Sequence, residues 1–528
     1  MRLAPVIVAA SLLNLACASF AQAPGSGMVA GPSMQSDPQI VTTLLQLMDV
    51  KDNTRPTNDD FTKTALKDLI TLGTPMGYHL RNRYMHLGIP LAEALAPTDD
   101  PRLHDQMLEL ARWDRYPEIR SVGLTVLAAR KDPETGKWCN EAINHPDPAV
   151  RFAAMEALLA WNKDPDVKQI LERVLFSDNQ IILKVFAAQA LLRRGDDKGR
   201  EELLKQLDSG DWLAKAMAAR YLGDFGVGDD YDLMLDRTGR EQTNNFVVAE
   251  MAIAALKLFP KKQAPEPEKP APVAVTATQE DELDPLIVTK PRLPIPATAL
   301  IDGRINANLL RLLETQSDAR PTPEQQQDPS LQTLGKLVSP AGFLLKIRYT
   351  ELGFLLTEGL AGSSDLLLRQ RVLAVARTGT NSMVRAAALM ALAYNQDLMD
   401  RGIFQEAAMS QNFTLRFAAV EALQAWGKEG ARDEIGNVAR MDASAFLQVY
   451  AAATIMRLGD PSGRDVLVRH WDDPDWVVRG LAIRTLGEFG IAEDYPRILM
   501  ALSQEQNNFV KAEMAGALLR LAKLQPKQ

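Results

Sequence analysis

Few residues of this 528-residue chain have the types and spacing that catalysis or metal binding requires. Its five histidines include no H-x-x-x-H pair, and neither a G-x-S-x-G elbow nor a phosphate-binding loop occurs. Gly226-Val227-Gly228 begins like a dinucleotide loop but lacks the third glycine and a preceding strand. We therefore expect no catalytic residues, no metal site and no cofactor.

Cysteine content and net charge argue against further classes of protein. With only Cys17 and Cys139, neither a disulfide framework nor a thiolate zinc cage can form. The formal net charge is −8 and no large basic block occurs, whereas binding to a phosphate backbone needs clustered cations. Nucleic acid is therefore not an expected partner.

The first 23 residues have the pattern of a secretory signal peptide. Arg2 precedes an apolar stretch over residues 3–15, and Ala21-Gln22-Ala23 matches an A-x-A cleavage site. Lipidation at Cys17 is the less favoured alternative, because Asn14 stands where such sites want Leu. We expect cleavage after Ala23 and a periplasmic or secreted protein. No later apolar stretch of about 18 residues predicts a transmembrane segment.

The remainder of the chain is a tandem duplication with an offset near 265 residues. Several blocks recur almost unchanged, among them 151–158 as 416–423, 55–57 as 320–322, and 244–252 as 507–515. Single residues recur with them: Gly77, Arg83, Tyr84, Gly88 and Glu93 return as Gly342, Arg348, Tyr349, Gly353 and Glu358. His79 and His86 correspond to Leu344 and Glu351, so neither histidine is kept in the second copy.

Each copy contains a shorter repeat of about 30 to 34 residues. Helix starts, most of them at Asp, Asn or Ser, are predicted at Pro117, Asp147, Asn179, Asp211, Asn245, Ser382, Asn412, Ser444, Asp475 and Asn508. After Asp147, apolar residues recur at the spacing of one helix face, and a shorter amphipathic helix precedes each such helix. Short helix pairs bury their apolar faces only by stacking, so the sequence predicts an all-α solenoid.

These patterns define the expected domains. Residues 1–23 are the signal peptide and 24–36 a flexible lead-in. Array 1 covers 37–259 and array 2 covers 301–526, with N-terminal cap helices at 37–98 and 302–362 that seal an apolar end of a stack. Between the arrays, the proline-rich residues 260–300 are expected to form a semi-stiff linker.

The repeats resemble a known family. The run 473–487, with its Asp-Pro-Asp-Trp-Val-Val-Arg start, looks like the inner helix of a HEAT repeat of the phycobilisome-lyase-like kind, and 145–151 looks like another. The resemblance covers roughly residues 100–258 and 365–524. It implies a HEAT/armadillo-like superhelix, and is almost silent on chemistry because such repeats occur in enzymes, adaptors and carriers.

Two sets of residues are candidates for partner binding. Arg151, Arg416 and Arg479 occupy one helical position, and form either a ladder of bonds between repeats or a cationic strip on the concave face. Trp212 and Trp476 share a first-turn position, where each either fixes the helix entry or anchors a partner.

The expected function is that of an exported, non-catalytic scaffold. Protein partners would bind the concave inner-helix surface of the two solenoids, and the linker would allow bivalent capture. Two alternatives stay open. One is a tetrapyrrole-handling lyase or chaperone, as the lyase-like repeats imply, and the other is a passive structural spacer of the cell envelope.

Overall fold

The structure is a computed structural model that describes residues 37–50, 54–98, 100–113, 116–161, 166–241, 243–263, 302–315, 319–363 and 365–525. The expected signal peptide, Cys17, the lead-in and residues 264–300 of the expected linker lie outside these ranges. Secondary structure in the described part is helical throughout. None of the described helices is long and apolar enough to span a membrane.

The chain divides into two compact units, and unit 1 combines both ends of the sequence. Its described residues lie within 37–157 and 396–525, together with residues 338–340. Its helices are α2 (Pro38–Met48), η1 (Asp60–Thr62), α3 (Thr64–Thr71), α4 (Pro75–Met85), α5 (Gly88–Leu95), α6 (Pro101–Trp113), α7 (Pro117–Ala129), α8 (Thr135–Ala142), most of α9 (Pro148–Trp161), η2 (Leu398–Asp400), α23 (Arg401–Ala408), α24 (Phe413–Trp426), α25 (Ala431–Met441), α26 (Ala445–Arg457), η3 (Pro461–Gly463), α27 (Arg464–His470), α28 (Trp476–Phe489), α29 (Asp494–Leu502), α30 (Asn508–Leu521) and η4 (Ala522–Leu524).

Unit 2 is built from the middle of the sequence, and its described residues lie within 158–263, 302–337 and 341–395. Its helices are α10 (Val167–Ser177), α11 (Ile181–Arg193), α12 (Asp197–Gln206), α13 (Trp212–Phe225), α14 (Asp230–Arg240), α15 (Asn245–Gln263), α16 (Gly303–Glu314), α17 (Pro323–Gln326), α18 (Pro329–Lys336), α19 (Pro340–Thr350), α20 (Leu352–Ala361), α21 (Leu366–Thr378) and α22 (Ser382–Asn395).

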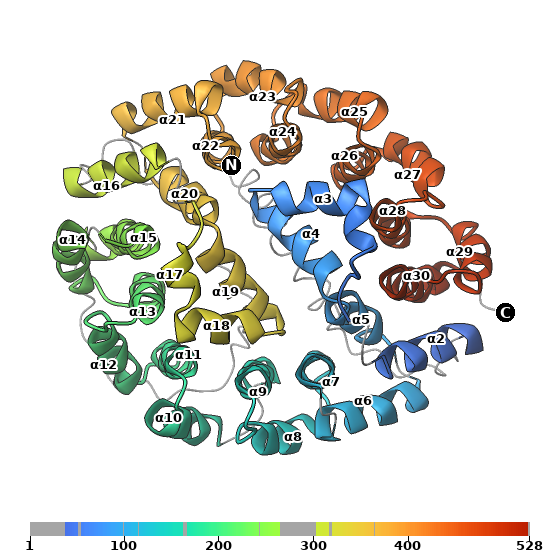
Figure 1. The fold of residues 1–528 in the computed structure, drawn as a ribbon, viewed down its shortest axis with the longest axis horizontal. Coiled ribbons are helices and arrows are strands. Elements are labelled where there is room, and N and C mark those ends of the chain that lie inside the picture. Colours follow the sequence, from blue (N-terminus) through green and yellow to red (C-terminus); the bar gives the residue numbers. More distant parts are fainter. Residues whose placement is uncertain are drawn as a thin grey trace. The chain divides into compact units, whose positions relative to one another are not determined.

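Both units have the two-layer construction of an α-solenoid. In unit 1, α23, α25, α27 and α29 form an outer layer and α24, α26, α28 and α30 an inner one (Figure 1). In unit 2, α10, α12 and α14 alternate in the same way with α11, α13 and α15 (Figure 1). The predicted all-α solenoid is confirmed.

The predicted helix starts are found within about two residues, because polar side chains cap the first turns. Asn412, Ser444 and Asp475 accept hydrogen bonds from the first-turn amides of α24, α26 and α28. Asp211 does the same for α13 in unit 2. The repeat spacing in the sequence is therefore the spacing of capped inner helices.

The boundaries of the two compact units differ from those of the two contiguous arrays expected from the sequence. In unit 1 the cap helices of copy 1, α2 and α5, pack on α30, the last inner helix of copy 2. In unit 2 the cap helices of copy 2, α16 and α20, pack on α15, the last inner helix of copy 1. Each cap thus covers the apolar end of the other copy. Because the two copies are similar in sequence, the sequence alone does not tell whether a cap covers the end of its own copy or of the other one.

The inner helices are buried on nearly every face. In α24 all residues from Phe417 to Trp426 are buried, and in α13 all residues from Ala216 to Gly223. Helix α3 lies against α24 and α28 in unit 1, and α18 lies against α11 and α13 in unit 2. The open concave surface expected from the sequence is therefore covered by the chain's own cap helices in the described part of each unit.

The expected linker also begins later than predicted. Helix α15 continues through Pro260 to Gln263, so residues 260–263 are helical. The Lys261 ammonium donates hydrogen bonds to the backbone oxygens of Asp224 (3.2 Å) and Gly226 (2.7 Å), which holds this last turn against the preceding repeat.

Candidate functional site

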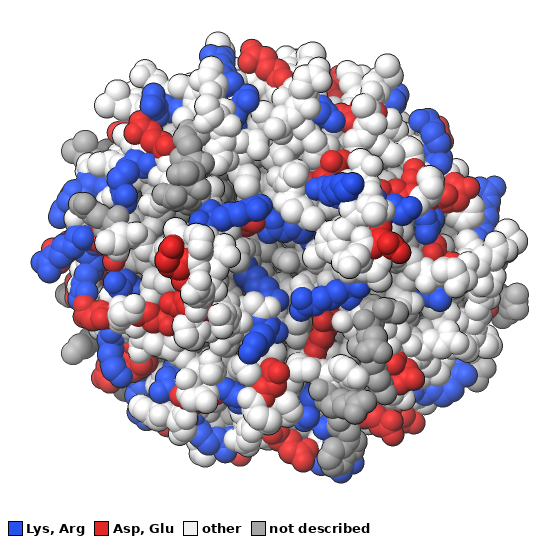
Figure 2. Space-filling view, in the orientation of Figure 1, with Lys and Arg blue, Asp and Glu red and all other residues white. Residues whose placement is uncertain are grey.

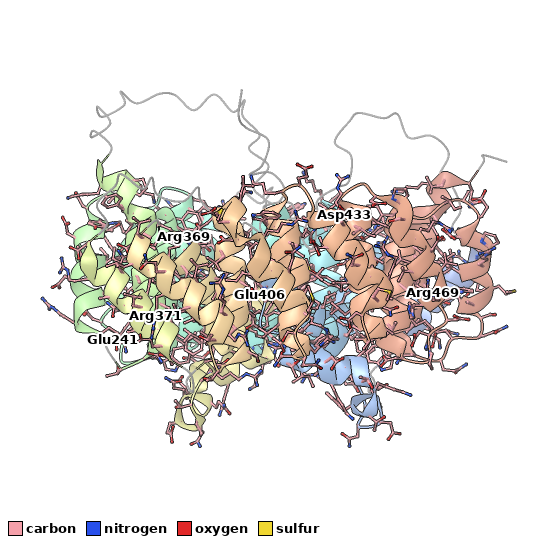
Figure 3. All side chains as sticks on the ribbon, turned by 90° about the horizontal axis from the view of Figure 1, so that it is seen from above. Glu241, Arg369, Arg371, Glu406, Asp433 and Arg469 are labelled. Atoms are coloured by element: carbon pink, nitrogen blue, oxygen red, sulfur yellow. The ribbon has the colours of Figure 1, made fainter. Side chains whose placement is uncertain are left out.

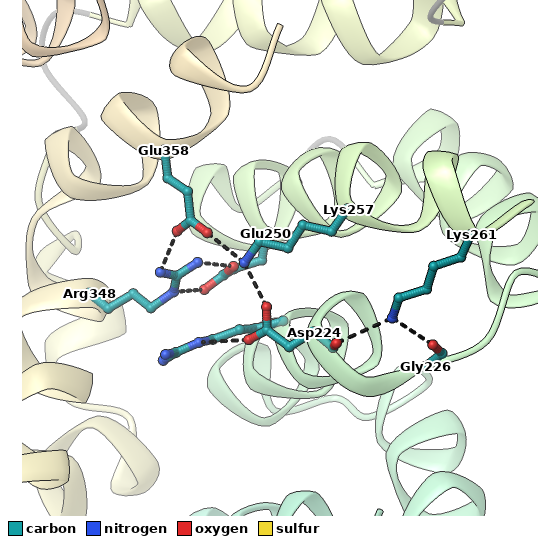
Figure 4. Close-up of polar contacts among 8 residues, drawn as sticks. Asp224, Gly226, Glu250, Lys257, Lys261, Arg348 and Glu358 are labelled. Carbon is teal, nitrogen blue, oxygen red and sulfur yellow. Dashed lines mark hydrogen bonds and ion pairs between the residues drawn. The ribbon is translucent and has the colours of Figure 1, made fainter. Parts of the chain in front are cut away.

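Where cap 2 meets the end of copy 1, unit 2 buries a group of charged side chains, the unit 2 ion cluster: Asp224, Glu250, Lys257, Arg348 and Glu358 (Figure 4). Arg348, from cap helix α19, pairs through Nε and Nη2 with the Glu250 carboxylate of α15, with Nη2 at 2.6 Å from Oε2. Its Nη1 lies 2.7 Å from Glu358 Oε2 on α20. Lys257 Nζ lies 2.7 Å from Asp224 Oδ1 and 2.5 Å from Glu358 Oε1, which closes the network.

Unit 1 has the corresponding group, the unit 1 ion cluster: Arg83, Glu93, Arg484, Glu488 and Glu513. Arg83 of cap helix α4 donates from Nε and Nη2 to Glu513 of α30, at 2.5 and 2.7 Å. Its Nη1 lies 2.7 Å from Glu93 Oε1 on α5. Arg484 of α28 lies 3.3 Å from Glu488 and 3.7 Å from Glu93. The same chemistry thus joins cap to array end in both units.

Burial and the opposite charges set the protonation of these groups. Burial alone would lower the pKa of Arg83, but the charges of Glu513 and Glu93 outweigh it and raise that pKa well above its ordinary value. Burial would raise the pKa of Glu93, yet Arg83 and Arg484 lower it to about 2. Beside them, burial and the charges of Arg484 and Arg83 lower the pKa of His79 to about 3. The cluster therefore holds fixed charges near neutral pH and a neutral histidine, which suits docking better than proton transfer.

The caps also bind the starts of the inner helices. The backbone N–H of Ala65 in α3 donates to the capping residue Asp475 of α28 at 3.0 Å. In unit 2 the equivalent Ser330 hydroxyl of α18 donates to Asp211, which caps α13. The Met76 amide, at the start of α4, donates to the buried Glu421 of α24 at 3.1 Å. Asp475 and Asp211 thus each cap an inner helix and also bond to a cap helix.

All three predicted arginines bond to their own chain. Arg151 Nη1 donates to the backbone oxygens of His145 and Pro146, both at 2.9 Å. Arg416 pairs with Asp442, which directly follows outer helix α25 (Nε to Oδ2, 2.7 Å), and donates to the backbone oxygens of Ser410 and Gln411.

Arg479 has the same arrangement two repeats further on, in α28. It pairs with Glu505 at 2.8 and 3.1 Å and donates to the Asp473 backbone oxygen. Arg416 and Arg479 thus reach an acid in the turn before the next inner helix, whereas Arg151 bonds to the turn before its own helix. The choice between a ladder and a binding strip stays a prediction.

The two predicted tryptophans pack on aromatic neighbours within their units. Trp476 is 3% exposed and contacts Tyr84 of α4 edge-on, with ring centroids 5.8 Å apart, and Phe509 of α30 at 5.1 Å. Trp212 is half-buried and lies 5.6 Å from Phe246 of α15. Trp476 thus anchors the chain's own cap.

Large apolar side chains are exposed instead where outer helices end. Met409 directly follows α23 and is 77% exposed, and Met441 ends α25 and is 81% exposed. These helices run in the same direction in consecutive repeats of unit 1, so both methionines lie along one edge, which we call the turn edge. In unit 2, Phe176 occupies the position equivalent to Met441 at the end of α10 and is 65% exposed.

The outer layer otherwise carries charged side chains. Figure 3 shows Glu406 on α23, Asp433 on α25 and Arg469 on α27, all of which are exposed. Positive and negative side chains are interspersed over the face drawn in Figure 2. Among the described residues, no group of three His, Cys, Asp or Glu is arranged to hold a metal ion.

The sequence analysis did not assign a role to the residues of the ion clusters, although their positions in the sequence indicated one. Arg83 and Glu93 recur in copy 2, and Glu250 and Glu513 stand within otherwise apolar runs. A charge kept at equivalent positions of two buried helices requires an opposite charge nearby. The sequence did not show which glutamate pairs with each arginine, because that glutamate lies in the other copy.

Comparison with known proteins identifies the repeats. The family model for HEAT repeats matches residues 105–184 and 433–519. No curated protein matches the chain. Among solved structures, the chain is similar to the karyopherin Kap121p bound to the SUMO protease Ulp1p (12% identity, TM-score 0.35) and to Kap121p bound to Pho4p (14%, 0.36). The matches cover 91% and 92% of this chain but only 53% and 52% of the karyopherin chains, so this chain spans about half their length.

Proposed function

We propose that this HEAT-repeat protein is an exported, non-catalytic scaffold that binds protein partners. The observation that carries the proposal is the exposure of Met409 and Met441 at the ends of successive outer helices. Methionine is flexible and polarisable, and exposed apolar side chains grouped on one edge are typical of protein-binding surfaces.

This proposal places the partner surface on the turn edge rather than on the inner helices. The inner helices are buried by the cap helices, and Arg416, Arg479 and Trp476 are engaged within the chain. A partner at the inner face would have to displace α3 and break the Ala65–Asp475 bond. The turn edge requires no such rearrangement.

Export is the second part of the proposal, and it is supported by the sequence pattern of residues 1–23. Sequencing the N-terminus of the protein purified from an envelope fraction tests it. A mature chain that begins at Pro24 supports cleavage after Ala23, whereas a lipidated Cys17 at the N-terminus supports lipoprotein processing. Retention of Met1 in a cytosolic fraction would contradict export.

Partner binding is tested by affinity purification of the tagged chain from the same fraction. Met409→Glu with Met441→Glu introduces two charges at the turn edge and is expected to abolish recovery of a stoichiometric partner. The matched control is Met399→Glu, because Met399 is 86% exposed and lies in η2, at the opposite end of α23 from Met409. Equal recovery with all three proteins would exclude the turn edge.

The same preparation distinguishes the two other functions. Absorbance above 350 nm without a protein partner would indicate a tetrapyrrole-handling protein. A colourless protein that recovers no partner in any variant would indicate a structural spacer of the envelope.

A further inference from the structure

We propose that the two repeat copies, residues 37–263 and 302–528, are complementary halves that recognise each other through cap docking and stay associated without the linker. Unit 1 joins the cap of copy 1 to the end of copy 2, and unit 2 joins the cap of copy 2 to the end of copy 1. Each half therefore gives one cap and receives one. The partner of each cap surface is therefore the other half of this chain.

The polar part of the interface does not distinguish the two caps. Arg83 and Arg348 occupy equivalent positions, and each pairs with a glutamate at an equivalent position of an end helix, Glu513 or Glu250. The second acids, Glu93 and Glu358, are equivalent as well. The ion clusters would accept either cap at either end.

The apolar packing does distinguish them, because one small–large pair is reversed between the units. In unit 1 the end helix α30 has Gly516, and its Cβ position lies 3.5 Å from Ala94 Cβ of cap helix α5. In unit 2 the glycine is on the cap instead. A Cβ at Gly359 of α20 would lie 3.3 Å from Ile253 of the end helix α15.

Residues 94 and 359 are equivalent, as are 253 and 516, so exchanging the caps changes the fit. Cap 1 on the end of copy 1 would press Ala94 against Ile253, whereas cap 2 on the end of copy 2 would place two glycines opposite each other and leave a void. Overfilled and underfilled contacts both weaken a packed interface. The two pairs therefore select the pairing of each cap with the other copy.

Association is tested on the full chain with a protease site inserted within residues 270–290. After the folded protein is cut, we expect the halves to co-elute as a 1:1 complex in gel filtration at micromolar concentration. Separation of two folded halves would overturn the proposal, and so would separation into aggregates, since neither half would then be held by the other.

Selection is tested in the same cut protein with Gly516→Ile, which places a branched side chain against Ala94. We expect the halves to dissociate about tenfold or more readily. Adding Ala94→Gly recreates the unit 2 arrangement in unit 1 and is expected to restore association. A Gly516→Ile protein as tightly associated as the wild type would overturn the selection, and a folded double variant without recovery would do the same. Circular dichroism of each variant reports whether the helices are intact.

Discussion

Arg83 and Glu513, 430 positions apart in the sequence, form a two-bond ion pair in which both side chains are about 1% exposed. The pair joins cap helix α4 to α30, the last inner helix of the other repeat copy. A charge buried to this degree is tolerated only with its partner in place. The contact therefore links the two ends of the sequence more specifically than apolar packing alone.

Glu513→Gln tests this link. The substitution leaves the Arg83 charge with one buried carboxylate instead of two, and breaking a buried pair costs about 3–5 kcal/mol of unfolding free energy. Urea denaturation followed by circular dichroism measures the loss. Glu314→Gln is the matched control, because its pair with Arg371 has side chains 56% and 51% exposed and contributes about 0–1 kcal/mol. Equal losses in the two variants would contradict the role of burial.

Glu421 gives a prediction about pH. Burial raises the pKa of this carboxyl from 4.5 to about 7 in the folded chain, against hydrogen bonds from Thr74 and Met76 that lower it. Below about pH 4.5 the group is protonated whether the chain is folded or unfolded. Between about pH 4.5 and 7 only the unfolded chain releases the proton, so the free energy of unfolding falls by on the order of 3 kcal/mol. Above about pH 7 the loss is complete.

Glu421→Gln removes this dependence and keeps an oxygen for the Met76 amide. We expect the variant to lose less stability than the wild type between pH 4.5 and 7, and to be the more stable protein at pH 8. Denaturation curves across this range measure the difference. Glu429→Gln, at an exposed position just after α24, should retain the slope of the wild type. A parallel pH profile for Glu421→Gln would show that this carboxyl is not the group responsible.

Arg479→Met tests whether this arginine position belongs to a structural ladder or to a strip that binds a partner. Because the guanidinium bonds to Glu505 and to the Asp473 backbone oxygen, its loss should cost about 1–3 kcal/mol of unfolding free energy. Thermal unfolding measures the loss, and Arg469→Met on the exposed face of α27 is the control. If Arg479→Met unfolds like the wild type yet loses a bound partner, the position belongs to a binding surface.

The repeats could be predicted from the sequence because their signals are local. Capping residues such as Asn412 and Asp475 stand beside the helices that they start, and the apolar spacing after Asp147 lies within one helix. The assignment of caps to array ends could not be predicted in this way. Arg83 and Arg348 stand at equivalent positions of the two copies, each followed by a tyrosine, so only three-dimensional packing shows that each contacts the other copy.

The sequence does contain a pattern that indicates a buried inner face, but a search for helices with one apolar face does not detect it. Helix α22 carries apolar residues around its whole circumference from Ala386 to Ala393, whereas a helix with one exposed face has a polar side. An all-round apolar helix in an array predicts a third layer over it. Here that layer is formed by cap helices such as α3 in unit 1 and α18 in unit 2.

Close helix crossings in both units depend on glycines at equivalent positions, and Gly487→Ala tests them. A Cβ at Gly487 of α28 would lie 2.5 Å from Ala517 Cα of α30, and one at Gly223 of α13 would lie 2.7 Å from Ala254 Cα of α15. Backbone atoms cannot yield as a flexible side chain can, so α28 and α30 must move apart.

We expect Gly487→Ala to lower the free energy of unfolding by about 1–3 kcal/mol from overpacking, although alanine has the higher helix propensity. Gly402→Ala is the control. It lies in the outer helix α23 with nothing within 4 Å of its Cβ position, so the propensity alone should stabilise the chain by up to about 1 kcal/mol. Opposite signs in the two denaturation midpoints are the expected result. A stabilised Gly487→Ala protein would show that α28 and α30 can separate without cost, which their ion-paired attachment to the cap through Glu513 argues against.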